Sequence, residues 1–363
     1  MPAPRPALDC DVPPAEAPGS QAPLLEPGSP QEINQAASVW MKRGISLLLV
    51  ADREPLTEAL ACFDRAIELR RQLPLEGNPW YRWALMAGWM NRADALTQLG
   101  SEAQIREALR CYDLAIANLQ GLPVNEEPLF RWRLAVAWLN RGITSQAVVK
   151  QDALRCFDNV IALLTGREES LRPDDRRTLA AAWYNRANTL VNAEPPRLLE
   201  AREAAKSAIA LTRSAEADDQ QLAEAGLKAR HVLCRALAGL LETPPVDHAT
   251  AEIWIMEATD AVEEGLARGH THFRPLLEEM FHFGARIYRA FQPHFLAEFL
   301  IEGIGATATV TEAMREAARE AICQAAQQIR SEGLAGFNPV TMQRLLGTLA
   351  ALNEAGERLR LNA

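Results

Sequence analysis

Four similar hexapeptides carry the residues of this sequence that are best suited to bind another molecule: VWMKRG, GWMNRA, AWLNRG and AWYNRA. In three of them an asparagine follows a tryptophan by two positions, which gives Asn91, Asn140 and Asn185. A carboxamide both donates and accepts hydrogen bonds, so it can bind the backbone of a peptide. A ladder of such groups is therefore the first hypothesis for a functional site.

The asparagines are expected to face away from the buried tryptophans. Apolar residues recur at helical intervals around each motif, which places the motif on a helix. Two positions along a helix correspond to about 200° of rotation, so we expect the amides to point to solvent. Small and polar residues share that face. The predicted binding groove comprises Asn91, Asp94, Arg133, Asn140, Asn185 and Asn188.

A second motif follows each of these four. It reads ALACFDRAI, ALRCYDLAI and ALRCFDNVI from Ala59, Ala108 and Ala153, and the degenerate AREAAKSAI begins at Ala201. The tryptophans are 49, 49 and 45 residues apart, and Leu227 takes the tryptophan place 44 residues later. Both motifs have helical periodicity, so each unit should be a helix-turn-helix. Strand-like alternation is absent, which predicts an all-α fold.

The two motifs resemble those of the tetratricopeptide repeat (TPR) family. The first helix of that family carries a large residue and, four positions later, a small one, as in Trp89 and Ala93; the second resembles ALRCYDLAI. The resemblance covers roughly residues 35–265, and it implies a right-handed superhelical array of about five TPR-like repeats. It also implies that the first helices line a concave groove in which asparagines bind an extended peptide. The units are longer than the family period of about 34 residues.

Charged residues recur at fixed places in both motifs. An arginine follows the tryptophan place by three residues in five units, at Arg43, Arg92, Arg141, Arg186 and Arg230. The second motif supplies Asp64, Asp113 and Asp158. Because a charge at a helix seam is costly unless paired, we expect each arginine to bind the aspartate of its own unit, as Arg92 with Asp113. The other expected pairs are Arg43 with Asp64 and Arg141 with Asp158. The alternative is an array of arginines that binds a carboxylate or phosphate partner.

Composition limits the expected partners and compartment. With 38 Lys and Arg against 47 Asp and Glu, the net charge is -9, so nucleic acid is not an expected partner. The six cysteines show no CxxC spacing and are expected to be reduced thiols of a cytoplasmic protein. No apolar run is long enough to cross a bilayer, so no membrane partner is expected.

The chain is expected to have three parts. Residues 1–30 hold nine of the 22 prolines and no recognisable targeting signal, which predicts a disordered tail. The repeat array is expected over residues 31–267, and residues 268–363 are expected to form a C-terminal helical region that caps it. Its helices are predicted at about 273–290, 293–304, 309–331 and 339–360.

Two other features leave alternatives open. The stretches PWYRW and PLFRW, 49 residues apart, are expected to add core between helices; the alternative is an aromatic rim to the groove. Histidines occur close together at His270, His272, His282 and His294, with Glu278 or Glu279 as further possible metal ligands. They lack HxxxH or HExxH spacing, so we expect no metal, no cofactor and no catalytic residue.

The expected function is that of a non-enzymatic cytoplasmic scaffold. It would bind a peptide or helix of a partner protein in the concave groove. One alternative is a self-associating adaptor, a homo-oligomer formed through the C-terminal helices. The other is a metal-dependent enzyme that uses the histidines between His270 and His294.

Overall fold

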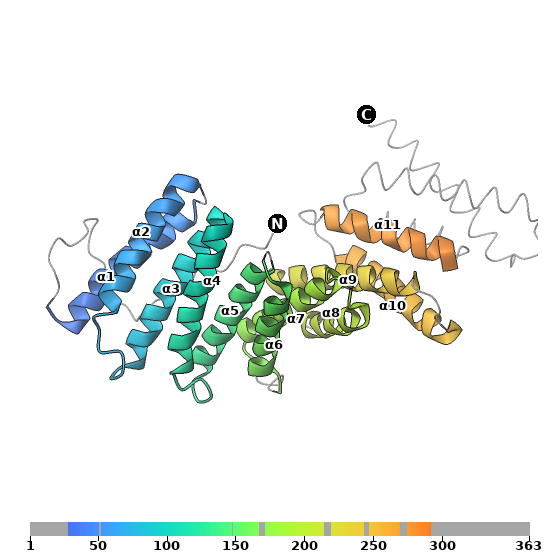
Figure 1. Ribbon diagram of the computed structural model, residues 1–363. Helices are drawn as coiled ribbons and strands as arrows, with labels where there is room; N and C mark the ends of the chain where they lie inside the picture. The colour runs from blue at the N-terminus through green and yellow to red at the C-terminus, as the bar shows by residue number, and fades with distance from the viewer. Residues whose placement is uncertain are drawn as a thin grey trace, which may run out of the picture. The chain divides into compact units, whose positions relative to one another are not determined.

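A computed structural model describes residues 28–50, 52–146, 148–166, 171–213, 219–242, 247–268 and 274–291. These residues form eleven α-helices and no strand, which confirms the all-α prediction (Figure 1). The helices are α1 (Pro30–Leu48), α2 (Arg53–Arg70), α3 (Pro79–Leu99), α4 (Glu102–Gln120), α5 (Pro128–Ser145), α6 (Lys150–Leu164), α7 (Pro173–Val191), α8 (Leu198–Arg213), α9 (Gln220–Leu241), α10 (His248–Arg268) and α11 (Arg274–Phe291). None of them has the length and apolar character needed to span a bilayer.

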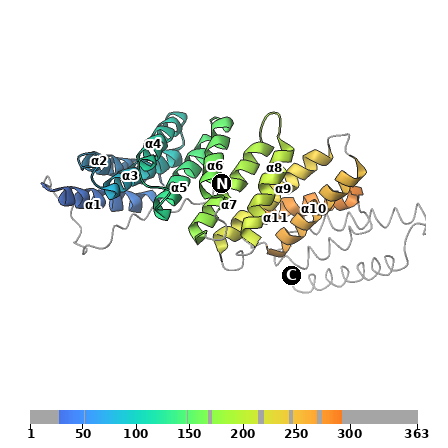
Figure 2. The same ribbon diagram turned by 90° about the horizontal axis from the view of Figure 1, so that it is seen from below.

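From α1 to α6, helices that are consecutive in the chain pack as neighbours. In the first part, α1 packs on α2, α3 on α4 and α5 on α6, and each pair packs on the next (Figures 1 and 2). Direct contacts also join α3 to α1 and to α5, so the first helices of successive pairs lie side by side. This is the arrangement that two alternating helical motifs predict.

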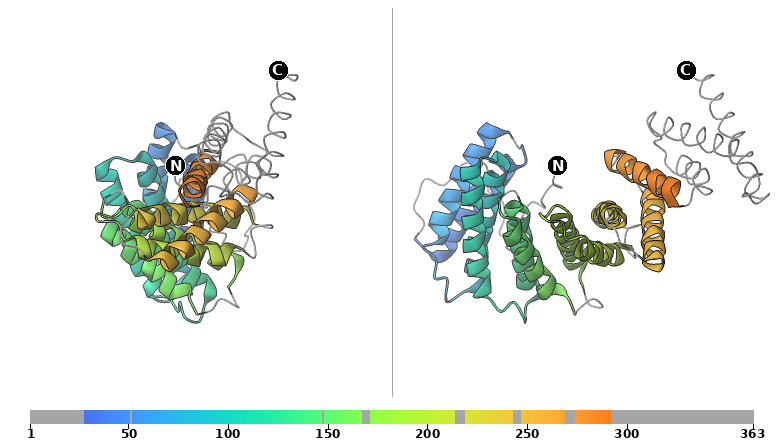
Figure 3. Two further views of the ribbon diagram at one scale, coloured as in Figure 1. Left: turned by 90° about the vertical axis from the view of Figure 1, so that its right-hand side faces the viewer. Right: turned by 45° about the vertical axis from the view of Figure 1, so that its right-hand side comes forward.

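The chain divides into two compact units, and the boundary falls inside α7. The first unit ends at Asn185 and the second begins at Arg186. Within the second unit, α9 packs between α8 and α10, and α11 packs on both α10 and α9 (Figure 3).

The ends of several helices follow the predicted signals. Pro79 and Pro128 are the first residues of α3 and α5, and the Asn78 side chain accepts a hydrogen bond from the backbone amide of Trp80 at 3.0 Å. Gly100 ends α3 with a φ of 76°, a left-handed conformation that disfavours a side chain. The predicted helix at 273–290 is α11, whereas the three helices predicted after it, and residues 1–27, lie outside the described residues.

The small residue of the first motif receives the aromatic residue of the second. A Cβ atom added to Gly44 would lie 2.5 Å from the Phe63 ring, and one added to Gly142 would lie 2.6 Å from the Phe157 ring. Both rings are fully buried. The two helices of a unit therefore approach closely enough that the missing side chain is part of the packing.

The repeated aromatic stretches add core at the N-terminal ends of α3 and α5. The rings of Trp83 and Phe130 are buried, with centroids 5.5 Å apart. The prediction of extra core between helices is confirmed for these two residues. Trp80, one turn before Trp83, remains 52% exposed.

Replacing Gly142 with alanine should lower the free energy of unfolding by about 1–3 kcal/mol, because the buried Phe157 ring must move. Urea unfolding of the full chain measures this change. The control is Gly77→Ala, where an added Cβ would have its nearest neighbour 3.8 Å away and should cost little. Equal, small effects at both positions would mean that the helices move apart at no cost, contrary to this interpretation.

Candidate functional site

The first two asparagines of the predicted ladder, Asn91 and Asn140, are buried. Asn91 is 1% exposed and Asn140 is 4% exposed, so the expectation that these amides face solvent is wrong. The equivalent residue of α1, Lys42, is exposed, and no described helix precedes α1. The position two residues after the tryptophan therefore faces the preceding repeat, which covers it.

The ladder amides bond to their own helices. Asn91 Nδ2 donates to the carbonyl oxygen of Ala87 at 2.9 Å, and Asn185 Nδ2 donates to that of Ala181 at 2.8 Å. Asn185 is half-buried. Each of these bonds takes one of the two N–H groups of the amide.

Two other predicted groove residues also lie in the interior. Asp94 is buried and accepts a hydrogen bond from the Tyr112 hydroxyl on α4. Arg133 is buried, and its guanidinium carbon lies 4.4 Å from the centroid of the Trp132 ring and 5.2 Å from that of Trp83. Stacking on aromatic faces stabilises a buried guanidinium. The prediction of an open groove over α3 and α5 is therefore wrong.

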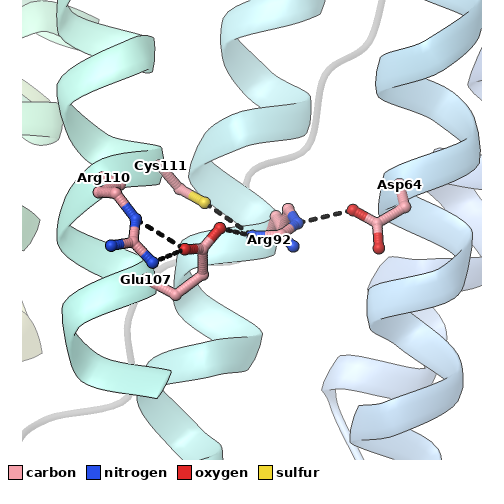
Figure 4. A network of polar contacts seen from close by, with 5 residues as sticks. All are labelled: Asp64, Arg92, Glu107, Arg110 and Cys111. Carbon is pink, nitrogen blue, oxygen red and sulfur yellow. Dashed lines mark hydrogen bonds and ion pairs between the residues drawn. The ribbon is translucent and has the colours of Figure 1, made fainter. Parts of the chain in front are cut away.

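The arginine of the first motif links one unit to the one before it. Arg92 Nε donates to Asp64 Oδ1, in the preceding unit, at 2.6 Å (Figure 4). Its Nη1 donates to Glu107 Oε1 and to Cys111 Sγ, in its own unit, at 3.0 Å each. Glu107 also accepts from Arg110 Nε at 2.8 Å. One side chain on α3 thus joins α2 to α4.

The same linkage recurs one unit later. Arg141 Nε donates to Asp113 Oδ1 at 2.6 Å, and its Nη1 donates to Cys156 Sγ at 3.2 Å. The expected pairs of Arg92 with Asp113 and of Arg141 with Asp158 are therefore wrong. The reason is that α2 and α4 also pack on the next first helix, and their aspartates face that helix.

The first unit differs because no described helix precedes it. Arg43 pairs with Glu58 of its own unit, not with Asp64 as expected. Glu58, Glu107 and Glu200 occupy the same place in the second motif, one residue before its first alanine. Glu200 lies 4.0 Å from Arg186. The repeated glutamate was a sequence signal for pairing within a unit, and it was missed.

The thiols beside these arginines are buried and unreactive. Burial raises the pKa of Cys111 and of Cys156, although the neighbouring Arg92 and Arg141 act in the opposite direction. A protonated thiol is a poor nucleophile. The described cysteines, Cys62, Cys111, Cys156 and Cys234, are buried free thiols, as predicted. The network around Arg92 is therefore a structural link between units.

The first-helix face is accessible farther along the chain, where α7 meets α9. Asn188 is half-buried, and Asn192 and Arg235 are exposed. Arg235 Nη2 donates to Asn192 Oδ1 at 2.8 Å, and Asn192 Nδ2 donates to Asn188 Oδ1 at 3.1 Å. These three residues form the amide–arginine cluster. Within the described residues, no carboxylate lies within ion-pair distance of Arg235, and its hydrogen-bond acceptors are neutral amide oxygens.

His231 lies one helical turn before Arg235 on α9. Its Nε2 lies 2.7 Å from Glu279 Oε2 on α11, which joins α11 to α9 at the border of the cluster. Burial lowers the pKa of His231, Glu279 raises it, and the charge of Arg235 lowers it further. The imidazole is therefore kept neutral near neutral pH.

The described part of the chain contains no group of three or more His, Cys, Asp and Glu side chains that could hold a metal ion. Of the predicted histidine group, His270, His272 and His294 and the side chain of His282 lie outside the described residues, as does the Glu278 side chain. Glu279 contacts His231.

The chain matches no protein-family model and no curated protein.

The periodicity of the motifs did not identify Arg235. It lies eight residues after Leu227, the degenerate tryptophan place, while Asn192 lies nine residues after Trp183. Because the two residues lie at nearly the same distance from the tryptophan places of their helices, they meet side by side, and Arg235 bonds to Asn192. Aligning α9 with α7 on the equivalent positions Leu227 and Trp183 would have placed Arg235 beside Asn192, even though the residue types do not repeat.

Removal of Asp113 should destabilise the chain more than removal of Asp64. Arg92 keeps Glu107 when Asp64 is lost, so Asp64→Ala should cost less than about 1 kcal/mol. Among the described residues, Arg141 keeps the Cys156 thiol alone when Asp113 is lost, so Asp113→Ala should cost about 1–3 kcal/mol. Urea unfolding of the two variants gives the comparison. A larger loss for Asp64→Ala would contradict the assigned contacts.

The lowered pKa of His231 predicts a stability that falls in acid. A folded-state pKa below the usual 6.5 means that its contribution is complete above that pH and is lost as the pH falls through the folded-state value. Melting curves between about pH 7.5 and about pH 5.5 should therefore show less destabilisation in His231→Gln than in the unchanged chain. Identical pH dependence in both proteins would show that His231 does not titrate as assigned.

Proposed function

We propose that this chain is a non-enzymatic scaffold of the tetratricopeptide type that binds a segment of a partner protein. The proposal includes about five helix-pair repeats in a right-handed superhelix. Support comes from the packing of consecutive helices and from the linkage of successive units by Arg92 and Arg141. A cytoplasmic location is part of the proposal, and it is supported by four buried free thiols.

The amide–arginine cluster is the surface that we assign to binding. On α3 and α5 the expected ligand-binding side chains are buried, whereas Asn192 and Arg235 are exposed. Arg235 is the observation that carries the assignment, because among the described residues it bonds only to amides, in a chain whose net charge is -9. An unneutralised guanidinium at the surface favours a carboxylate ligand.

The expected ligand is an extended segment that carries an acidic side chain or a free carboxyl terminus. The guanidinium of Arg235 would bind the carboxylate with two parallel hydrogen bonds, which a lysine could not reproduce. The amides of Asn188 and Asn192 would then bind backbone N–H and C=O groups of the same segment.

Affinity capture from the source cell, followed by calorimetric titration of the captured partner, tests this function. Arg235→Ala should weaken binding by about 1.5–3 kcal/mol, which is roughly 10- to 150-fold. Asn188→Ala should weaken it by about 0.5–1.5 kcal/mol. The melting temperature should hardly change in either variant, because both side chains are at least partly exposed.

The matched control is Arg65→Ala, which removes an equally charged, exposed side chain on α2 that pairs with Glu68. It should leave the affinity unchanged. Equal losses in Arg65→Ala and Arg235→Ala would reduce the effect to net charge. Unchanged affinity in Arg235→Ala would move the binding surface away from the α7–α9 face.

A further inference from the structure

One side of α1 is exposed where the same side of α3 and of α5 is buried. Gln35, Val39, Lys42 and Ser46 follow one another at intervals of four, three and four residues, so they lie on one side of the helix. The residues 49 positions later in α3, and 49 positions later again in α5, are all buried. In α1 all four are exposed. These four residues and Arg43 form the end face.

The second helix of the preceding unit covers the corresponding face of α3. A Cβ atom added to Gly88 would lie 2.8 Å from Cγ1 of Ile67, so α2 touches α3 at this position. Three residues before Ile67, Asp64 accepts the hydrogen bond from Arg92 Nε at 2.6 Å. The aspartate–arginine bond has the same length between α4 and α5. A second helix therefore presents an aspartate and, three residues later, an apolar residue to the next unit.

Arg43 makes only half of the ion pairs that Arg92 makes. It pairs with Glu58 in its own unit, as Arg92 pairs in its own (Figure 4). Within the described residues its Nε donates to no carboxylate, and its side chain is 55% exposed, against 18% for Arg92 and 15% for Arg141. Among the same residues, no carboxylate lies within ion-pair distance of Lys42. The end face thus has two cations at the place where a preceding helix would supply an acceptor.

We propose that the end face binds a helix of a partner protein that carries an aspartate and, three residues later, an alanine. The aspartate accepts a hydrogen bond from Arg43 Nε, as Asp64 accepts one from Arg92, and the charge of Lys42 adds to the attraction. Such a helix repeats at the end of the array the contact that already joins its units.

The size of Val39 decides which apolar residue fits. Val39 occupies the place of Gly88, against which the Ile67 side chain packs. Isoleucine would collide with a valine there, and overpacking of this kind is destabilising, so the partner helix needs the smaller alanine. The other stripe positions of the end face are polar, which keeps the face soluble when it is empty. This surface is independent of the amide–arginine cluster.

A stapled helical peptide with the sequence of residues 53–70, which form α2, tests the proposal against the full chain. Phe63, which packs on Gly44 in the chain, is replaced by glutamine, and Cys62 is replaced by serine. One form of the peptide keeps Ile67, and the other carries Ile67→Ala. Fluorescence anisotropy of the labelled peptides measures the affinity. We expect the alanine form to bind about tenfold more tightly.

A double-mutant cycle tests the ion pair. Asp64→Asn in the alanine peptide should weaken binding about tenfold, and Arg43→Gln in the chain should weaken it equally. The two changes together should cost no more than either alone, because they remove the same bond. The matched control is Arg65→Gln, which removes an exposed arginine that pairs with Glu68 and should leave the affinity unchanged.

The chain variant Val39→Gly tests the size rule. It recreates the environment of Gly88, so the isoleucine peptide should then bind as tightly as the alanine peptide. Melting curves check that each variant is folded. If Val39→Gly unfolds, the cycle between Arg43 and Asp64 decides alone.

Four results would overturn the proposal. They are no binding of the alanine peptide up to about 1 mM, equal losses in Arg65→Gln and Arg43→Gln, additive losses in the cycle, and an unchanged preference for alanine in folded Val39→Gly. Sedimentation of the chain alone tests another occupant. A dimer that Arg43→Gln dissociates would assign the end face to a second copy of the chain, against the proposal.

Discussion

Arg92 and Arg141, each three residues after the tryptophan of its motif, place a permanent positive charge where two helix pairs meet. Such a charge is tolerated only if acceptors from both sides reach it. At Arg92 the acceptors are Asp64 from one unit and Glu107 and Cys111 from the next. Correct docking of one pair thus completes the environment of a charge in the following pair. In a linear array, nearest-neighbour terms of this kind set how far folding propagates along the chain.

Local signals in the sequence were sufficient for the elements and their order. The two alternating motifs predicted the all-α fold. The prolines Pro79 and Pro128 predicted where α3 and α5 begin. The pairing partner of Arg92 was not predictable in the same way. Asp64 and Asp113 are equivalent residues of two successive units. The sequence of one unit does not show whether its aspartate faces the first helix of the same unit or that of the next.

The candidate site was predictable only in part, for a related reason. Helical rotation correctly separated Asn91 from the tryptophan side, but it gave no information on how closely α1 approaches α3. The first helices lie side by side, so that face is buried in α3 and α5 and is accessible again at Asn188 and Asn192. Small residues on a helix face leave room for a ligand, and they leave the same room for a neighbouring helix.

The buried thiols have a practical consequence. Cys62, Cys111 and Cys156 lie at equivalent places in α2, α4 and α6, one in each of three successive units. A thiol reagent can reach each sulfur only when its own unit opens, so the three alkylation rates report three local opening equilibria in one molecule. The chain therefore carries natural probes of its stability, unit by unit, without any engineered label.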